Sequence, residues 1–217
     1  MNQQEMAARL QAVEDTLQID KLEKIYGYYL DNGMFQEVID LFSDNAESVE
    51  IGDRGVFKGK DGVQRFFWGY LGANGKPRPA GDMAFHMQHQ GVIDIAPDGK
   101  TAKGRWYCTM IQARPIEKGG PVRSVLGHGV YENEFVKEDG KWMFSKIFYS
   151  LNYRSPIAEG WAQTPVIASG IAPASDAPPT AYHPYPDIEF VPFHWKHPVT
   201  GQATPEHRSE EKHDKGK

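Results

Sequence analysis

The feature that most constrains the fold is a pair of alternating segments at residues 84–112, AFHMQHQGVIDIAPDGKTAKGRWYCTMIQ. Apolar and polar residues alternate on both sides of the turn Ala96-Pro97-Asp98-Gly99, which predicts two antiparallel strands joined as a hairpin. Because side chains alternate across a strand, even-numbered residues of the second strand share one face, which we expect to line a cavity. These residues are Ala102, Gly104, Trp106, Cys108 and Met110.

Helices are predicted before this hairpin and further strands after it. Apolar residues recur at helical spacing over residues 14–31, 35–42 and 63–71, and Asn32-Gly33 is a typical helix end. A short strand is expected at 47–51, and long strands at 121–136 and 141–152. Helices followed by antiparallel strands indicate an α+β fold, in which three N-terminal helices cover one face of a curved sheet and leave a hollow suited to a ligand.

The composition changes from Ser155 onwards, and this change suggests the domain limits. Ten of the 15 prolines follow Ser155, and helical or strand periodicity ends there. We expect one domain over 1–154 and an extended, proline- and aromatic-rich tail over 155–204. The aromatic residues of the tail favour packing on its own domain or on a partner subunit. Residues 205–217 are charged and are expected to be disordered.

Charge and hydropathy exclude several classes of partner. The net charge is −5 and the basic residues are scattered among acids, so nucleic acid is not an expected partner. The chain has no apolar run long enough for a membrane span and no secretory signal, so we expect a cytoplasmic protein without a membrane partner. The single cysteine, Cys108, rules out an internal disulfide and indicates a buried thiol.

No metal or cofactor is expected. His86 and His89 are three residues apart, which on a strand places them on opposite faces. His194 and His197 lie in the tail without a nearby cysteine or acidic companion. The sequence also lacks a glycine-rich phosphate loop and a Gly-x-Ser-x-Gly elbow, which argues against nucleotide use and serine hydrolysis.

Two residues are candidates for acid–base chemistry. Asp31 ends the first predicted helix, where the helix dipole disfavours a carboxylate, and His86 opens the first strand of the hairpin. Tyr28 lies three residues before Asp31 and shares its helix face. Each residue also has a purely structural interpretation: Asp31 as a solvated residue before the turn, and His86 as a packed histidine.

Several short segments, in this order and spacing, resemble one known superfamily. They are Tyr29-Leu30-Asp31, Leu41-Phe42-Ser43-Asp44-Asn45-Ala46, Val56-Phe57-Lys58-Gly59, His86 at a strand start, and the run from Tyr131 to Trp142. Together they cover residues 14–153. The pattern resembles the nuclear transport factor 2-like superfamily, in its polyketide-cyclase and scytalone-dehydratase-like branch.

This resemblance implies a cone-shaped α+β barrel with an internal pocket, commonly paired into a homodimer through the outer face of the sheet. It also implies that Asp31 and His86 are catalytic and that Tyr28 and Tyr131 hold the substrate or a developing oxyanion. Further substrate contacts are expected from six residues: Glu50, His89, Trp106, Met110, Gln112 and Asn133. Glu50, Gln112 and Tyr131 depart from the scytalone dehydratase pattern, so scytalone itself is not the expected substrate.

The expected function is that of a cofactor-independent lyase acting on a hydroxylated aromatic compound. Acid–base elimination of water from a para-phenol would pass through a quinone methide, which needs no cofactor. The long tail resembles that of bacterial members that break down aromatic compounds, which adds the possibility of formaldehyde release from a lignin-derived diarylpropane diol. Two alternatives remain open: an isomerase of the ketosteroid type, with Asp31 or Glu50 as base, and a non-catalytic ligand-binding dimer module.

Overall fold

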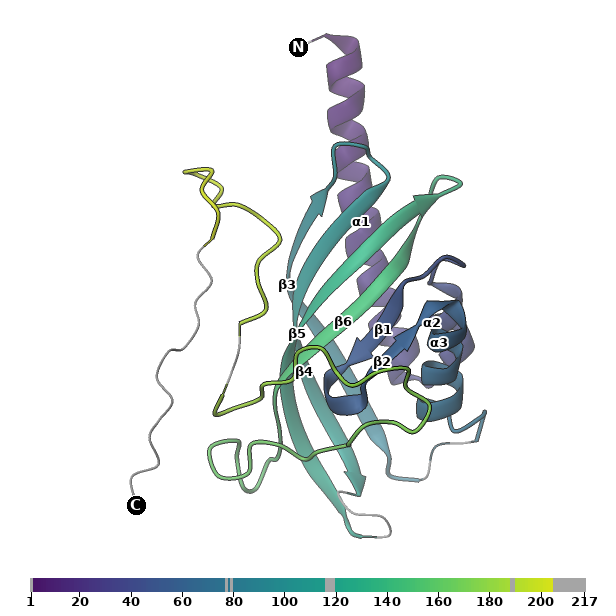
Figure 1. Cartoon of the computed structure of the whole chain (residues 1–217), viewed down its shortest axis with the longest axis vertical. Helices are drawn as coiled ribbons and strands as arrows, with labels where there is room; N and C mark the ends of the chain where they lie inside the picture. The colour runs from purple at the N-terminus through teal and green to yellow at the C-terminus, as the bar shows by residue number, and fades with distance from the viewer. Residues whose placement is uncertain (1, 77, 79, 116–119, 188–189, 205–217) are drawn as a thin grey trace.

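A computed structural model describes residues 2–76, 78, 80–115, 120–187 and 190–204, and shows a curved six-stranded sheet with helices on its concave side (Figure 1). The strand order is β2-β1-β6-β5-β4-β3, and every pair is antiparallel except β1 with β6. The strands are β1 (Ser48–Ile51), β2 (Val56–Lys58), β3 (Met83–Ile95), β4 (Thr101–Pro115), β5 (Val122–Glu138) and β6 (Lys141–Pro156). The predicted α+β class and curved, mostly antiparallel sheet are confirmed.

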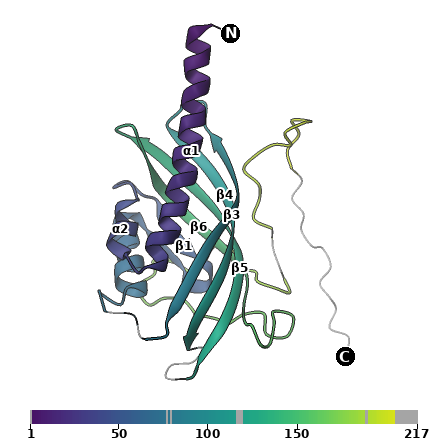
Figure 2. The same ribbon diagram turned by 180° about the vertical axis from the view of Figure 1, so that it is seen from behind.

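The long helix α1 (Gln3–Asp31) starts well before the predicted residue 14. Asn2 and Glu5 explain the early start, because the Asn2 side chain accepts the Glu5 N–H at 2.8 Å and Glu5 accepts the Asn2 N–H at 2.9 Å. Residues 2–14 are exposed, and the first turns of α1 project beyond the sheet (Figure 2). From Asp15 onwards the helix packs on the sheet and carries its buried residues.

The other helical segments follow the predicted order with different bounds. Helix α2 spans Phe35–Asp40 and a short 3₁₀ turn spans Gly52–Arg54. The third predicted helix is α3 (Gly59–Gln64) continued by a π-helix over Arg65–Leu71, which buries Phe66 and Phe67. Strand β2 was not predicted, because its three residues are too few to show a periodicity. In the described part of the chain, no helix has the length and apolar character needed to cross a membrane.

The hairpin β3–β4 has the predicted turn and the predicted facing. In β4 the even positions Trp106, Cys108 and Met110 are at most 7% exposed, whereas Tyr107 and Ile111 are 38% and 36% exposed. His86 pairs with Met110, and the register shifts between His89 and Val92. The even positions therefore share the buried face of β4, as the alternation predicted, but of the five residues expected to line a cavity only Met110 lines the one beside His86.

Helix α1 packs on the inner face of the sheet and ends close to β3. Helix α1 presents Ile19, Glu23, Tyr26 and Leu30 to the sheet, all buried. A Cβ on Gly27 would lie 3.2 Å from the carbonyl oxygen of His86, so glycine lets the helix approach β3 closely. This approach brings the end of α1 beside the start of β3, where the two candidate catalytic residues lie.

The tail after β6 returns along the body of the molecule (Figure 1). Ala177 pairs with Val56, and the Asp53 carboxylate accepts the N–H groups of Ser169 and Gly170 at 2.5 and 2.7 Å. Further along, Arg105 donates to the carbonyl oxygen of Val191 at 3.0 Å. The described tail thus contacts its own domain. The predicted disordered segment, 205–217, lies outside the described residues.

Candidate active site

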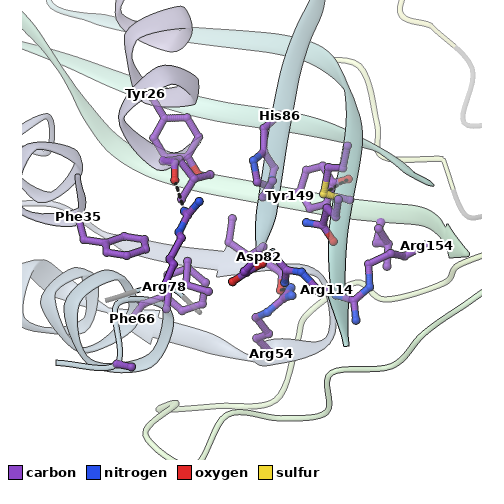
Figure 3. Close-up of a pocket in the computed structure, with 18 of the residues that line it drawn as sticks. Tyr26, Phe35, Arg54, Phe66, Arg78, Asp82, His86, Arg114, Tyr149 and Arg154 are labelled. Carbon is purple, nitrogen blue, oxygen red and sulfur yellow. Dashed lines mark hydrogen bonds and ion pairs between the residues drawn. The ribbon is translucent and has the colours of Figure 1, made fainter. Parts of the chain in front are cut away.

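A cavity of about 210 Å³ lies between the C-terminal half of α1, the π-helix and the inner face of the sheet (Figure 3). An apolar cavity of about 150 Å³ can hold benzene, so this one has room for a substituted aromatic ring. Its apolar wall includes Leu30, Phe35, Phe66 and Leu71. Several polar side chains converge on the same space, which is the arrangement expected of a ligand site.

His86 and Asp31 form a hydrogen-bonded pair at the edge of this cavity. His86 Nδ1 lies 2.7 Å from Asp31 Oδ1, and the backbone N–H of His86 donates to the same carboxylate at 3.0 Å. Both side chains are largely shielded, 13% and 14% exposed. His86 lines the cavity, whereas Asp31 borders a neighbouring surface groove and stands behind the imidazole. The carboxylate therefore fixes the ring and leaves Nε2 as the nitrogen available to a ligand.

Three buried tyrosines line the same cavity as His86. The hydroxyls of Tyr26 and Tyr131 lie 3.4 Å apart, and the ring of Tyr149 lies 4.6 Å from that of Tyr131. Burial, as the largest cause, raises the pKa of all three phenols above the ordinary value, so each stays protonated at neutral pH. Neutral phenols can donate hydrogen bonds to a substrate oxygen or to a developing negative charge.

The structure brings some of the predicted site residues together. His86, Tyr131, Met110 and Gln112 all line the cavity, with Asp31 behind His86. The side-chain oxygen of Gln112 is buried and has no hydrogen-bond partner within the described residues, so it can accept a hydrogen bond from a ligand.

Tyr28 does not reach the cavity, which corrects its predicted placement. It is 72% exposed and borders the outer groove. Two residues along a helix correspond to a rotation of about 200°, so Tyr26 and Tyr28 point to opposite sides. Tyr26 belongs to the apolar helix stripe visible in the sequence and takes the position expected of Tyr28.

Four predicted substrate contacts also lie outside the cavity. Glu50 is buried but accepts from the N–H of Thr180 at 2.6 Å, which uses this carboxylate to hold the tail. Asn133 donates to Glu23 at 2.9 Å inside the core, and Trp106 packs against Phe135. His89 is exposed. Glu50, Asn133 and Trp106 point inward, as strand alternation indicates. They lie at other positions along the sheet than the cavity, and alternation does not predict that position.

The sequence interpretation missed several cavity residues besides Tyr26. Tyr149 and Leu151 come from β6, and four arginines come from separate parts of the chain: Arg54, Arg78, Arg114 and Arg154. Arg114 had a usable signal, since it continues the inward even positions of β4 after Met110 and Gln112. Within the described residues, no group of three or more His, Cys, Asp and Glu side chains is arranged to hold a metal ion.

Comparisons with known proteins agree with this architecture. A family model described as a SnoaL-like domain matches residues 11–147, and the chain belongs to this family, within the nuclear transport factor 2-like superfamily that the sequence resembled. No curated protein matches it.

Solved structures with the same fold share few residues with the chain. A putative scytalone dehydratase from Novosphingobium aromaticivorans is 19% identical, with 67% of this chain and 89% of that chain covered and a TM-score of 0.54. A hexachlorocyclohexane dehydrochlorinase, LinA-type3, from Novosphingobium barchaimii is 19% identical, with coverages of 69% and 94% and a TM-score of 0.57. LinA Type2 is 20% identical, with coverages of 80% and 99% and the same TM-score of 0.57.

Proposed function

We propose that the protein is a cofactor-independent lyase that eliminates water from a hydroxylated aromatic compound. The observation that carries the proposal is the His86–Asp31 pair, whose imidazole lines a cavity large enough for an aromatic ring. Structures of the same fold named as a putative scytalone dehydratase and as dehydrochlorinases support an elimination reaction. Both names describe loss of a small molecule from adjacent carbons.

His86 is the group that moves protons in this proposal. Its Nδ1 is held by Asp31, so Nε2 can give a proton to the departing hydroxyl or take one from the neighbouring carbon. Asp31 stabilises the charged imidazole and keeps the ring oriented. A para-phenol on the substrate would lose its proton to solvent and push electrons through the ring as the benzylic hydroxyl, protonated by His86, leaves as water, giving a quinone methide.

Tyr26 and Tyr131 hold the oxygen on which charge develops. Both hydroxyls are buried and adjacent, and neither phenol ionises at neutral pH. Two donors fixed in a water-poor site stabilise an oxyanion more than water does. Loss of a proton from the neighbouring carbon would complete the dehydration. Loss of the proton from a terminal hydroxymethyl group would instead break the C–C bond and release formaldehyde. The position of the substrate decides between these two outcomes.

The ketosteroid-type alternative has less support. It needs a carboxylate base inside the cavity, but Asp31 stands behind His86 and Glu50 is held by Thr180. We keep two further expectations from the sequence as part of this proposal: a cytoplasmic location and a homodimer. A non-catalytic receptor would bind the same ligands without turnover.

The test is a screen of hydroxylated aromatic alcohols, followed by absorbance for the conjugated product and by an assay for formaldehyde. His86→Gln and Asp31→Asn should each lower turnover of the best substrate by about a hundredfold or more, the usual effect of losing a positioned acid or base. His128→Gln is the matched control, because His128 stacks on Tyr153 on the other face of the sheet. Equal turnover by wild type and both site variants would contradict the proposal.

A further inference from the structure

The cavity carries an excess of positive charge that the elimination chemistry does not use. Arg54, Arg78, Arg114, Arg154 and Lys76 all line it, against one carboxylate, Asp82. Figure 3 shows Arg54, Arg114 and Arg154 gathered at one end, with His86 away from them. These three arginines come from the 3₁₀ turn, the end of β4 and the end of β6, so the fold itself brings them together.

The three arginines are incompletely paired. The Nε atoms of Arg54, Arg114 and Arg154 are buried and have no hydrogen-bond partner within the described residues. Arg154 is only 8% exposed, and its one described side-chain bond is from Nη1 to the hydroxyl of Ser169, a neutral acceptor, at 3.0 Å. Buried cations of this kind are costly unless an anion accompanies them.

The two nearby carboxylates, Asp82 and Asp53, offset the charge of the three arginines only in part. Asp82 approaches Arg114 only to 3.9 Å. Asp53 acts on Arg154 through space, but one of its oxygens already accepts two backbone N–H groups of the tail. Burial, together with the charges of Arg54 and Arg114, lowers the pKa of Arg154 to about 10, so the guanidinium is still charged at neutral pH and is repelled by its neighbours.

Arg78 has a different task from the other three arginines. It donates to the carbonyl oxygens of Leu30 and Asp31 at 2.7 Å each, where α1 ends without a basic residue of its own. This contact completes the C-terminus of the helix. The group left for a ligand is therefore the cluster of Arg54, Arg114 and Arg154.

The cluster lies one ring length from the proposed acid–base pair. His86 is in register with Met110, and Met110, Gln112 and Arg114 are successive inward residues of β4. Four residues of strand correspond to about 13 Å. A single aromatic ring with a short acidic side chain spans this distance once the side chains of His86 and Arg114 extend towards it.

We propose that the substrate of this site is an aromatic acid, whose carboxylate binds Arg54, Arg114 and Arg154 while its hydroxylated end lies beside His86. Guanidinium groups bind carboxylates through paired, charge-assisted hydrogen bonds, which would occupy the free Nε donors. This inference rests on the proposed function for the direction of the substrate, but the anion site stands on the arginines alone.

The experiment compares matched ligands that differ only in charge. Thermal shift and titration calorimetry would be run at neutral pH with 4-hydroxycinnamate and its amide, 4-hydroxyphenylacetate and its amide, and 4-hydroxybenzoate and its amide. We expect at least one carboxylate to bind about tenfold or more tightly than its amide, the scale of one charged hydrogen bond. Equal results within all three pairs, whether or not the ligands bind, would overturn the inference.

Arginine variants test which residues cause the preference for a carboxylate over its amide. Arg114→Gln should abolish it, and Arg54→Gln provides a second variant if circular dichroism shows that the first is misfolded. Arg123→Gln is the charge-matched control, because Arg123 is exposed, is paired with Glu159 and does not line the cavity. A preference that survives in Arg114→Gln and Arg54→Gln would also overturn the inference.

His86→Gln separates this inference from the proposed function. It should lose turnover and keep the preference for the carboxylate. Full turnover by His86→Gln would end the proposed mechanism and leave the anion site standing. Lost turnover in His86→Gln, together with no carboxylate preference in the wild type, would support the proposed mechanism and overturn the anion site.

Discussion

Glu23 shows how strongly one buried residue can couple this fold to pH. It is fully buried between α1 and the sheet, and its Oε2 accepts from Asn133 at 2.9 Å. Burial is the main cause that raises its pKa from 4.5 to about 8. The folded protein therefore keeps this proton when the unfolded chain has lost it, so the stability that the group contributes is lost as pH rises from 4.5 to about 8.

Glu23→Gln tests this linkage. The amide keeps an acceptor for Asn133 and cannot ionise, so the variant should gain stability over wild type as pH rises from 5 to 8, by roughly 3 to 5 kcal/mol at full effect. Melting temperatures across this range measure the difference. Glu14→Gln, an exposed change on the same helix, should follow the wild type, and a parallel pH profile for Glu23→Gln would refute the argument.

The placement of the candidate site residues was predictable where their position in a regular element determined it. Asp31 and His86 end and open regular elements, and the structure places them within hydrogen-bond distance. Tyr28 was misplaced because Tyr26 belongs to the buried helix stripe. The arginine cluster was out of reach, because Arg54 and Arg154 approach Arg114 only through the curvature of the sheet, which sequence periodicity does not encode.

At the scale of elements, the contact between the tail and β2 depends on Gly55. This residue has φ of +90°, and a Cβ there would lie 2.6 Å from the carbonyl oxygen of Ala177. A side chain would strain the backbone and push the tail away from Val56, with which Ala177 pairs. The glycine is therefore required by both the turn and the neighbouring chain.

Gly55→Ala should lower stability by more than about 1 kcal/mol and make the tail near Ala177 more sensitive to protease. Gly140→Ala is the matched control, since its φ is +78° and nothing lies within 4 Å of the added Cβ. The control carries the backbone strain without the collision. Equal effects of the two changes on melting temperature and proteolysis would mean that the tail does not depend on this contact.

Elements were predicted best where a pattern repeats. The strands of the β3–β4 hairpin gave long alternations and were found at nearly the predicted bounds. The helix start was missed because an exposed helix segment has no buried stripe to show, and its capping box, Asn2 with Glu5, was the available signal. The π-helix was not predictable, because its hydrogen-bond shift leaves the apolar spacing nearly unchanged.

At the scale of the whole molecule, the outer face of the sheet is unusually apolar. Phe85, Met87, Tyr107 and Ile111 are between 36% and 47% exposed on the adjacent strands β3 and β4. Phe85 and Ile111 are directly paired, so these side chains form one continuous patch. A patch of this kind commonly marks an interface between subunits.

Light scattering after gel filtration should therefore find a dimer for the wild type. Ile111→Lys should shift the mass towards that of one chain, 24.4 kDa, because it places a charge at the centre of the patch. Val199→Lys, at an 87% exposed tail position, should leave the mass unchanged. A wild type that elutes as a single chain would contradict the expected homodimer.

The fold class was predictable as a whole because it depends on the order of helices and strands, which composition and alternation reveal. The path of the tail was not, since its contacts run through single side chains such as Asp53 and Asp176, without a repeating pattern. The family resemblance likewise came from the order and spacing of short sequence segments. It fixed the architecture and left the substrate to be read from the cavity.

The projecting turns of α1 have a consequence for how this protein can be shortened. Met6, Leu10 and Val13 are 54%, 60% and 56% exposed, so the first turns add little to the stability of the body. Deleting residues 2–12 should move the melting temperature by no more than a few degrees, as measured by calorimetry. A larger fall in melting temperature that depends on protein concentration would show that the projecting end of α1 contacts other molecules.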